Sequence, residues 1–386
     1  EIQGSSHTSP LLGKKVENVQ GIVTAFRGDG FYMQSLNPDN DPDTSEGILV
    51  FTQLPPRVRP GAIVLVTGVV SEIYPGGIET GNLSITQLTS PKVTEISKDN
   101  PLPQPIILGE GGLLPPTMIV DNDRMREFQP TEDGIDFYES LENMLVQIND
   151  AVVVGATNAY KEIVVVGDGG KNVSMMNNRG SLVLRADDYN PERIILDDSL
   201  RSIPNANVGD QFDQPVIGIV DYTFGNFKIQ PIGKLAVGPG GIEQETARAA
   251  VENELSIASY NVENLDARDN QERFDTVAAT IVNHLQSPDI VNLVEIQDNL
   301  GAFDDGNADA NETYQKIIDT ITSIGGPIYQ YREITPAVNQ DGGEGGGNIR
   351  VGFLFRTDRG LEFVDKPGGD ARTPVELIET ASGVQL

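Results

Sequence analysis

The sequence predicts a multidomain protein in which two β-rich modules precede the start of an α/β domain. The 386 residues exceed the size of an ordinary single domain. Gly occupies 41 positions and Pro 24, while apolar residues make up 38%, which is typical of a turn-rich β protein. After Glu254 the sequence pattern changes: predicted strands separated by turns give way to predicted strands that alternate with helices.

Residues 1–98 are expected to form a small β-barrel such as an OB-fold. Turn signals such as Gly28-Asp29-Gly30 and Pro75-Gly76-Gly77 separate the apolar or alternating stretches. Five strands in about 90 residues fit this kind of barrel. The expected strands are Val16–Phe26, Phe31–Gln34, Gly47–Phe51, Ala62–Ile73 and Asn82–Leu88.

Residues 99–116 are rich in Pro and Gly, and we expect a semi-rigid linker because proline limits both helix and sheet. Residues 117–240 repeat the β pattern and predict a second, OB-like domain with a short helix over Asp133–Asn143. Its expected strands are Met144–Val154, Glu162–Val166, Ser181–Leu184, Gln214–Tyr222 and Phe227–Pro231. Residues 241–253 are expected to form a polar connector.

Residues 254–386 are expected to begin an α/β domain that is incomplete within this chain. The sequence from Gln271 to Leu285 places apolar residues on one face at helical spacing, and Tyr314–Ile324 is a second expected helix. The expected strands are Leu255–Asn261, Ile290–Ile296 and Arg350–Arg356.

Polar side chains stand at the ends of two of these strands. Asn261 closes the first strand, and Glu295 lies near the end of the second. A carboxylate delivered by an apolar strand to a sheet edge, beside an amide, suits a hard cation such as Mg²⁺. A glutamate at a strand end also commonly serves as a solvated or capping group, so these two residues alone leave both interpretations open.

Several segments in order resemble the endonuclease/exonuclease/phosphatase family, whose fold is the DNase I-like α/β sandwich. They are YNVEN at 260–264, the helix that contains Arg273 and Phe274, PDIVNLVEIQDN at 288–299, and GGNIRVGFLFR at 346–356. Residues 1–250 resemble the N-terminal region of bacterial extracellular nucleases of this family, including an OB-fold module. The resemblance covers essentially the whole chain.

The resemblance implies that Glu295 binds Mg²⁺, with Mn²⁺ or Ca²⁺ as alternatives, and that Asn261 lies beside the metal and the scissile phosphate. Both residues would then be catalytic, and water would attack a phosphodiester in line. The expected substrate is nucleic acid, either DNA or RNA. The resemblance also implies a secreted bacterial protein, although no signal peptide is visible in the sequence, and no protein partner can be inferred.

The family's C-terminal histidine motifs and Asp-x-Asn pair have no counterpart in this sequence. Its two histidines, His7 and His284, stand outside those motifs, and we expect both to be structural or solvent-exposed. We therefore expect this chain to be the N-terminal part of a longer enzyme and to be inactive by itself. Two alternatives stay open: a phosphatase or phosphodiesterase acting on a different phosphoester, and a non-catalytic secreted adhesion or binding protein.

The composition sets further limits. The absence of Cys excludes disulfides and thiol nucleophiles, and no apolar run is long enough to span a membrane. The net charge of −30 repels nucleic acid at long range. It indicates either a solvated surface suited to solubility or salty surroundings, or carboxylates of which some hold divalent cations that offset the repulsion locally. Two acidic loops are weak Ca²⁺ candidates, with plain acidic turns as the alternative. Their candidate ligands are Asp39, Asp41 and Asp43 in one loop, and Asp305, Asn307 and Asp309 in the other.

The expected OB-fold also raises the hypothesis of single-strand binding, which uses aromatic residues and a basic groove. The alternative is that the aromatic residues fill the barrel and the arginines are scattered. The candidates are Phe31, Tyr32, Phe51 and Tyr74, with Arg27, Arg57 and Arg59 nearby. The glycine-rich segment 341–347 lacks the Lys of a phosphate-binding loop and is expected to be a mobile connection.

Overall fold

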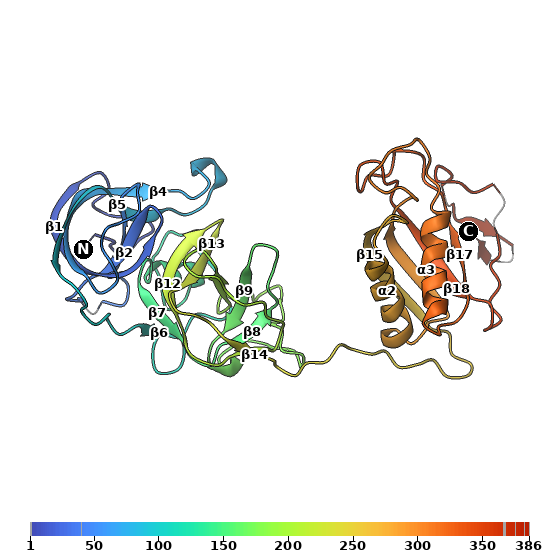
Figure 1. Ribbon diagram of the computed structural model, residues 1–386, viewed down its shortest axis with the longest axis horizontal. Coiled ribbons are helices and arrows are strands. Elements are labelled where there is room, and N and C mark those ends of the chain that lie inside the picture. Colours follow the sequence, from blue (N-terminus) through green and yellow to red (C-terminus); the bar gives the residue numbers. More distant parts are fainter. Residues whose placement is uncertain (1, 40, 366–367, 375, 382, 386) are drawn as a thin grey trace. The chain divides into compact units, whose positions relative to one another are not determined.

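The computed structural model describes residues 2–39, 41–365, 368–374, 376–381 and 383–385. It divides into two compact units, Glu1–Ile242 and Glu243–Leu386 (Figure 1). The chain is β-rich, with several sheets and few helices, which confirms the expected β-rich character. Within the described residues, no helix combines the length and the apolar character that crossing a membrane requires.

The first five long strands form a closed barrel in the order β1-β2-β3-β5-β4 (Figure 1). Strands β3 and β5 pair in parallel, and the other neighbours are antiparallel. Val23, Val50, Val64 and Val66 fill the interior and are fully buried. The elements are β1 (Lys15–Arg27), β2 (Gly30–Gln34), β3 (Gly47–Phe51), β4 (Ile63–Ile73), the short helix η1 (Ile78–Thr80) and β5 (Ile85–Ser97).

The following residues form one nine-stranded sheet in the order β14-β11-β8-β9-β10-β13-β12-β7-β6. A second OB-like module was expected here, but this sheet runs between two edge strands, β14 and β6. Its elements are β6 (Ile106–Ile107), α1 (Gly134–Glu139), β7 (Leu145–Ile148), β8 (Val152–Gly155), β9 (Glu162–Val166), η2 (Asp168–Gly170), β10 (Ile194–Asp197), β11 (Gln211–Phe212), β12 (Val216–Thr223), β13 (Asn226–Pro231) and β14 (Val237–Gly238).

Three local expectations for this region need correction. The stretch 144–154 is two strands, because the chain turns at Asp150, whose φ is 44°. The stretch 181–184 is not a strand; Leu182 makes only an isolated bridge to Met176 across a tight turn. The expected linker 99–116 contributes β6, which pairs with β7, and Leu108, which is buried in the core of the sheet.

The barrel and the nine-stranded sheet share a buried core within the first unit. Tyr32 and Leu49 of the barrel pack with Leu145 and Ile219 of the sheet. The Tyr32 hydroxyl donates a 2.9 Å hydrogen bond to Oδ2 of Asp221, which lies 189 residues further along the chain. These contacts explain why the two expected modules form one compact unit.

The second unit is a four-stranded sheet in the order β15-β16-β18-β17. Strands β15 and β16 are parallel, and the other neighbours are antiparallel. The helices lie where the periodicity predicted them, and α2 and α3 pack against each other on one face of the sheet. The elements are β15 (Ile257–Leu265), α2 (Gln271–Ala279), η3 (Thr280–His284), β16 (Ile290–Ile296), α3 (Asn311–Ser323), β17 (Tyr329–Glu333), β18 (Arg350–Arg356), β19 (Ile378–Thr380) and β20 (Gly383–Gln385).

Candidate functional site

The two strand-end residues that the sequence singled out lie side by side. Asn261 belongs to β15 and pairs with Val294 of the parallel strand β16, directly before Glu295. Nδ2 of Asn261 donates a 2.6 Å hydrogen bond to Oε1 of Glu295. Parallel strands bring their carboxyl ends to the same sheet edge, which explains how residues 34 positions apart meet here.

A bulge in β16 turns Glu295 toward Asn261. Leu293 and Ile296 are both buried in the core beneath the helices, so two residues stand between them where regular alternation allows one. Glu295 takes a left-handed φ of 64°, which is uncommon for a residue other than glycine. Without this extra residue, alternation would direct Glu295 into the core on the side of Leu293.

The neighbouring strand β15 has the same irregularity at the same level. Val262 and Leu265 are both buried in the core, and Glu263 and Asn264 between them have φ values of 54° and 57°. The pairing of β15 with β16 shifts over this stretch. Bulges in adjacent strands therefore turn the polar side chains of this edge away from the hydrophobic core.

The orientation of the Asn261 amide is fixed at both ends. Its Oδ1 accepts the backbone N–H of Glu263 at 2.8 Å, while its Nδ2 donates to Glu295. Asn261 is exposed and Glu295 is half-buried. Among the described residues, no hydrogen bond reaches Oε2 of Glu295, so this oxygen can take a further ligand.

Arg273 fastens the bulge of β15 to helix α2. Its Nη2 donates to the carbonyl oxygens of Val262 at 2.9 Å and Glu263 at 2.6 Å. Its Nη1 pairs with Oδ2 of Asp269 at 2.7 Å. The planar guanidinium can reach these acceptors at once because its donors form a rigid fork. The sequence had placed Arg273 on a helix without giving it a role.

Polar residues that follow β16 form hydrogen bonds to β15 and to the loop before β18. Nε2 of Gln297 donates to Oδ1 of Asn264 at 2.7 Å, and Nδ2 of Asn348 donates to Oδ2 of Asp298 at 2.7 Å. A side chain at Gly347 would place its Cβ 2.1 Å from Oε1 of Gln297, so a larger residue there would displace the Gln297 side chain. The segment after β16 is thereby locked to the loop before β18.

Asn299 joins this layer to helix α3. Its Oδ1 accepts the backbone N–H groups of Glu312 at 2.8 Å and Thr313 at 3.3 Å. These are free donors of the first helical turn, so Asn299 caps α3 from a loop outside the helix.

A protein family described only as a domain of unknown function (DUF8508) matches residues 107–238. This range is about a third of the chain and extends from β6 to β14. It therefore coincides with the nine-stranded sheet of the first unit. No curated protein shows a significant match to the chain.

The two acidic loops use their side chains to hold their own backbone. Oδ1 of Asp39 accepts the N–H of Asp41, and Oδ1 of Asp41 accepts that of Asp43; Asn40 lies outside the described residues. In the second loop, Oδ1 of Asp305 accepts the N–H of Asn307, and Oδ1 of Asn307 that of Asp309. Neither loop brings three carboxylates together; among the described residues, that occurs only at Asp121, Asp123 and Asp133.

The sequence pattern did not single out this last group, although Asp121 and Asp123 show the same alternate spacing as the acidic loop at 39–43.

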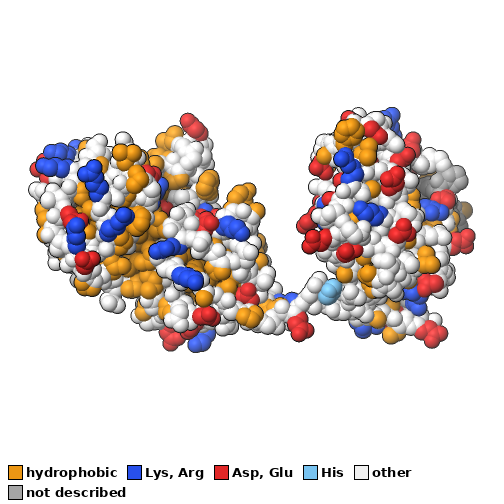
Figure 2. Space-filling model, viewed as in Figure 1, with side chains coloured by type: hydrophobic (Ala, Val, Ile, Leu, Met, Phe, Trp, Pro, Cys, Tyr) orange, Lys and Arg blue, Asp and Glu red, His pale blue; other side chains and the backbone are white. Residues whose placement is uncertain are grey.

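Two of the four aromatic candidates of the barrel are not available for stacking. Phe31 and Tyr32 are buried, with exposures of 0% and 1%. Arg27 pairs with Asp29 at 2.6 Å, and Arg59 lies over the ring of Phe26. On the face shown in Figure 2, basic side chains are interspersed with acidic ones. Phe31 and Tyr32 therefore belong to the core, while Phe51 and Tyr74 are half-buried.

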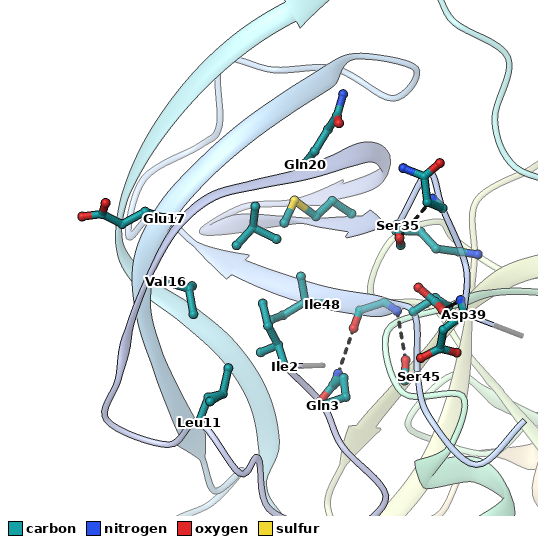
Figure 3. A pocket seen from close by; sticks show the side chains of 16 residues that line it. Ile2, Gln3, Leu11, Val16, Glu17, Gln20, Ser35, Asp39, Ser45 and Ile48 are labelled. Atoms are coloured by element: carbon teal, nitrogen blue, oxygen red, sulfur yellow. Dashed lines mark hydrogen bonds between the residues drawn. The ribbon is translucent and has the colours of Figure 1, made fainter. Parts of the chain in front are cut away.

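A pocket opens at one end of the barrel, where Ile2 and Leu11 of the N-terminal segment lie beside Val16 and Ile48 (Figure 3). Nε2 of Gln3 donates to the carbonyl oxygen of Gly47 at 2.9 Å. The charged residues of its lining are all acidic: Glu17, Asp39 and Glu46. A pocket of this charge repels phosphate groups.

The two histidines have different surroundings. Nε2 of His7 lies 2.8 Å from Oδ1 of Asp136, and its Nδ1 lies 3.5 Å from Oε2 of Glu139. His7 thus joins the N-terminal segment to helix α1. His284 ends η3, where its Nδ1 lies 3.5 Å from the Thr246 hydroxyl.

Proposed function

We propose that the second unit carries the metal- and phosphate-contacting edge of a Mg²⁺-dependent phosphodiesterase, and that its substrate is nucleic acid. The observation that carries this proposal is the 2.6 Å contact between Asn261 and Glu295 above bulges in two adjacent strands. Bulges and left-handed residues are concentrated at functional sites, where they direct side chains that regular strands would bury.

The donors at this edge fit a hard divalent cation. Oε1 of Glu295 is occupied by the Asn261 amide, which leaves Oε2 for a metal ion. Mg²⁺ is commonly held by one or two carboxylates together with water and substrate phosphate, and it would stabilise the charge on the phosphoryl oxygens. Asn261 would orient Glu295, and its second amide hydrogen could bind a phosphate oxygen.

The arrangement of strands supports the finer assignments that we propose. A barrel that closes in the order β1-β2-β3-β5-β4 is compatible with an OB-fold. The parallel pair β15 and β16, covered by α2 and α3 on one face, is compatible with one layer of a DNase I-like sandwich. A fold alone supports many activities, so the proposal depends on the site.

The test is cleavage of supercoiled plasmid DNA and of RNA by the natural full-length protein with Mg²⁺ or with EDTA. We expect Glu295→Gln to cleave roughly a hundredfold more slowly or worse, because the ligand charge is lost. Glu272→Gln, at an exposed position of α2, is the matched control and should cleave normally. Equal rates for Glu295→Gln and the unmodified protein would contradict the proposal.

The substrate class is tested with the same proteins. Hydrolysis of a nucleotide, inositol phosphate or lipid headgroup without cleavage of DNA or RNA, and with loss in Glu295→Gln, would retain the site and change the substrate. No hydrolysis of any of these esters would favour a binding protein.

A further inference from the structure

Three carboxylates converge in a loop of the first unit, far along the chain from Glu295. Asp121, Asp123 and Asp133 each place one oxygen so that the three atoms lie within 4.8 Å of one another. The loop is closed at its base by backbone hydrogen bonds from Gly134 to Ile119 and from Ile135 to Val120, at 2.9 and 3.0 Å. Residues twelve positions apart are thus held together by the fold.

Asp133 is the member that points to a ligand. It is only 1% exposed, and among the described residues neither of its carboxylate oxygens has a hydrogen-bond partner. A buried carboxylate without a partner is costly, so a bound cation would remove a substantial penalty.

Asp136 lies three residues further along the chain and is a buried carboxylate that does have partners. It is also buried, but its Oδ2 accepts the backbone N–H of Gln129 at 2.7 Å and its Oδ1 lies 2.8 Å from Nε2 of His7. The contrast shows that burial in this region does not by itself leave a carboxylate unpaired.

The other two carboxylates are held in place by the loop itself. Oδ1 of Asp121 accepts the N–H of Met125 at 3.0 Å. Oδ1 and Oδ2 of Asp123 accept the N–H groups of Arg126 and Glu127 at 2.8 and 2.7 Å. A carboxylate has about four acceptor positions, so both side chains can still face a cation next to Asp133.

We propose that this loop binds a Ca²⁺ ion through Asp121, Asp123 and Asp133. All three donors are oxygens, and Ca²⁺ takes such ligands at 2.3–2.6 Å, so two ligands of one ion can lie up to about 5 Å apart. Mg²⁺ usually keeps several of its waters and is seldom held by protein ligands alone, so a site with three protein carboxylates favours Ca²⁺. Water and loop carbonyl groups complete the coordination, and the acidic chain attracts the ion.

Binding should make the loop harder to open. Arg124 and Arg126 are exposed within the loop, so the rate at which trypsin cleaves after them measures how readily the loop opens. The full chain is stripped with a chelator, exposed to trypsin with and without added Ca²⁺, and the cut positions are identified by mass spectrometry. At a Ca²⁺ concentration ten times the dissociation constant, cleavage after Arg124 and Arg126 should fall about tenfold. Cleavage after the exposed Arg57 should not change.

The variants make the result specific. Asp133→Asn and Asp121→Asn should each lose the Ca²⁺-dependent protection, and unchanged cleavage after Arg57 shows that the barrel stays folded. Asp39→Asn in the other acidic loop and Glu295→Gln should keep the protection, so this test is independent of the proposed phosphodiesterase site. Protection that is absent from the unmodified chain, or that persists in Asp133→Asn, would overturn the proposal. Equal protection by the same concentration of Mg²⁺ would overturn the assignment to Ca²⁺.

Discussion

At the scale of single residues, the Asn261 amide both donates and accepts a hydrogen bond, which an ionised carboxylate could not do. It donates to Glu295 and accepts from the backbone of Glu263. An amide has both a donor and an acceptor end, whereas an ionised aspartate only accepts. The residue type at this position is therefore set by the contact with Glu295.

This leads to a prediction for Asn261→Asp in the full-length protein. Two carboxylates would face each other across 2.6 Å, and Glu295 would lose its donor. We expect the rate of DNA cleavage at low Mg²⁺ to fall by about tenfold or more, with partial recovery at high Mg²⁺, because the cation screens the repulsion. The measurement is the cleavage rate as a function of Mg²⁺ concentration. Asn283→Asp, an exposed amide of the same unit, should leave this curve unchanged.

Residues differ in how far the sequence could predict them. Asn261 and Glu295 were predictable because both follow apolar strand patterns, which place them at a sheet edge. Arg273 was not, because its role depends on carbonyl oxygens ten and eleven residues away that only the folded bulge presents. The alternate spacing of Asp121 and Asp123 was visible, but the burial of Asp133 depends on packing that no local pattern encodes.

At the scale of elements, the N-terminus of helix α3 is capped by a residue outside the helix. The Asn299 amide oxygen satisfies two backbone donors of the first turn. We expect Asn299→Ala to lower the free energy of unfolding of the second unit by about 1 kcal/mol, since a lost cap leaves these donors unpaired. Urea unfolding monitored by far-ultraviolet circular dichroism measures this change.

The control for the cap is Asn311→Ala at the first position of the same helix. Among the described residues, Oδ1 of Asn311 accepts only from the Asn299 side chain, at an exposed site, so its loss should matter little. A similar loss of stability in both variants would show that Asn299 acts through Asn311 rather than through the backbone.

Helices and strands were not equally predictable. The spacing of Phe274, Val277 and Ile281 is a strong local signal, and the structure places all three in the core. Bulges break the period of two on which strand prediction rests, so the reversal at Glu295 could not be read from alternation. The turn at Asp150 was missed for a related reason, because apolar residues continue on both sides of it.

At the scale of the whole molecule, the first unit has a pH-sensitive contact between its N-terminal segment and α1. His7 lies between Asp136 and Glu139, and Glu72 and Glu142 are further acidic groups near Glu139. Burial lowers the pKa of His7, but Glu139 and Asp136 together outweigh this effect, so its pKa is raised above the ordinary value. The pKa of Glu139 is raised by burial, with His7 opposing the shift.

Both shifts have the same consequence. A histidine with a raised pKa stabilises the fold fully below its ordinary value of 6.5, and this contribution is lost as the pH rises through the folded value. A buried carboxyl with a raised pKa is also favoured at lower pH, where it is protonated. We therefore expect the backbone amides of 134–142 to lose protection against hydrogen exchange as the pH rises from about 6 to 8.5, after correction for intrinsic rates.

His7→Gln should flatten this dependence, and His284→Gln, in the second unit, should retain it. A pH profile that is unchanged in His7→Gln would show that the carboxylates alone produce the effect.

The organisation of the whole chain was only partly predictable. Turn signals and strand spacing indicated two β regions and a later α/β region. They could not show that Tyr32 would contact Asp221, because a contact between residues 189 positions apart leaves no local trace. Strand β6 could not be predicted within the Pro-rich stretch either, because the strand consists of only two residues that pair with the sheet.

The contact between Tyr32 and Asp221 has a consequence for how such domains are inherited. A relative that kept the nine-stranded sheet and lost the barrel would expose Leu145 and Ile219. In that relative the Asp221 carboxylate would also lose the hydrogen bond from the Tyr32 hydroxyl. We expect natural proteins with that architecture to carry polar substitutions at these positions or to recruit another module over them. The same surface should decide where laboratory fragments of this chain stay in solution and where they precipitate.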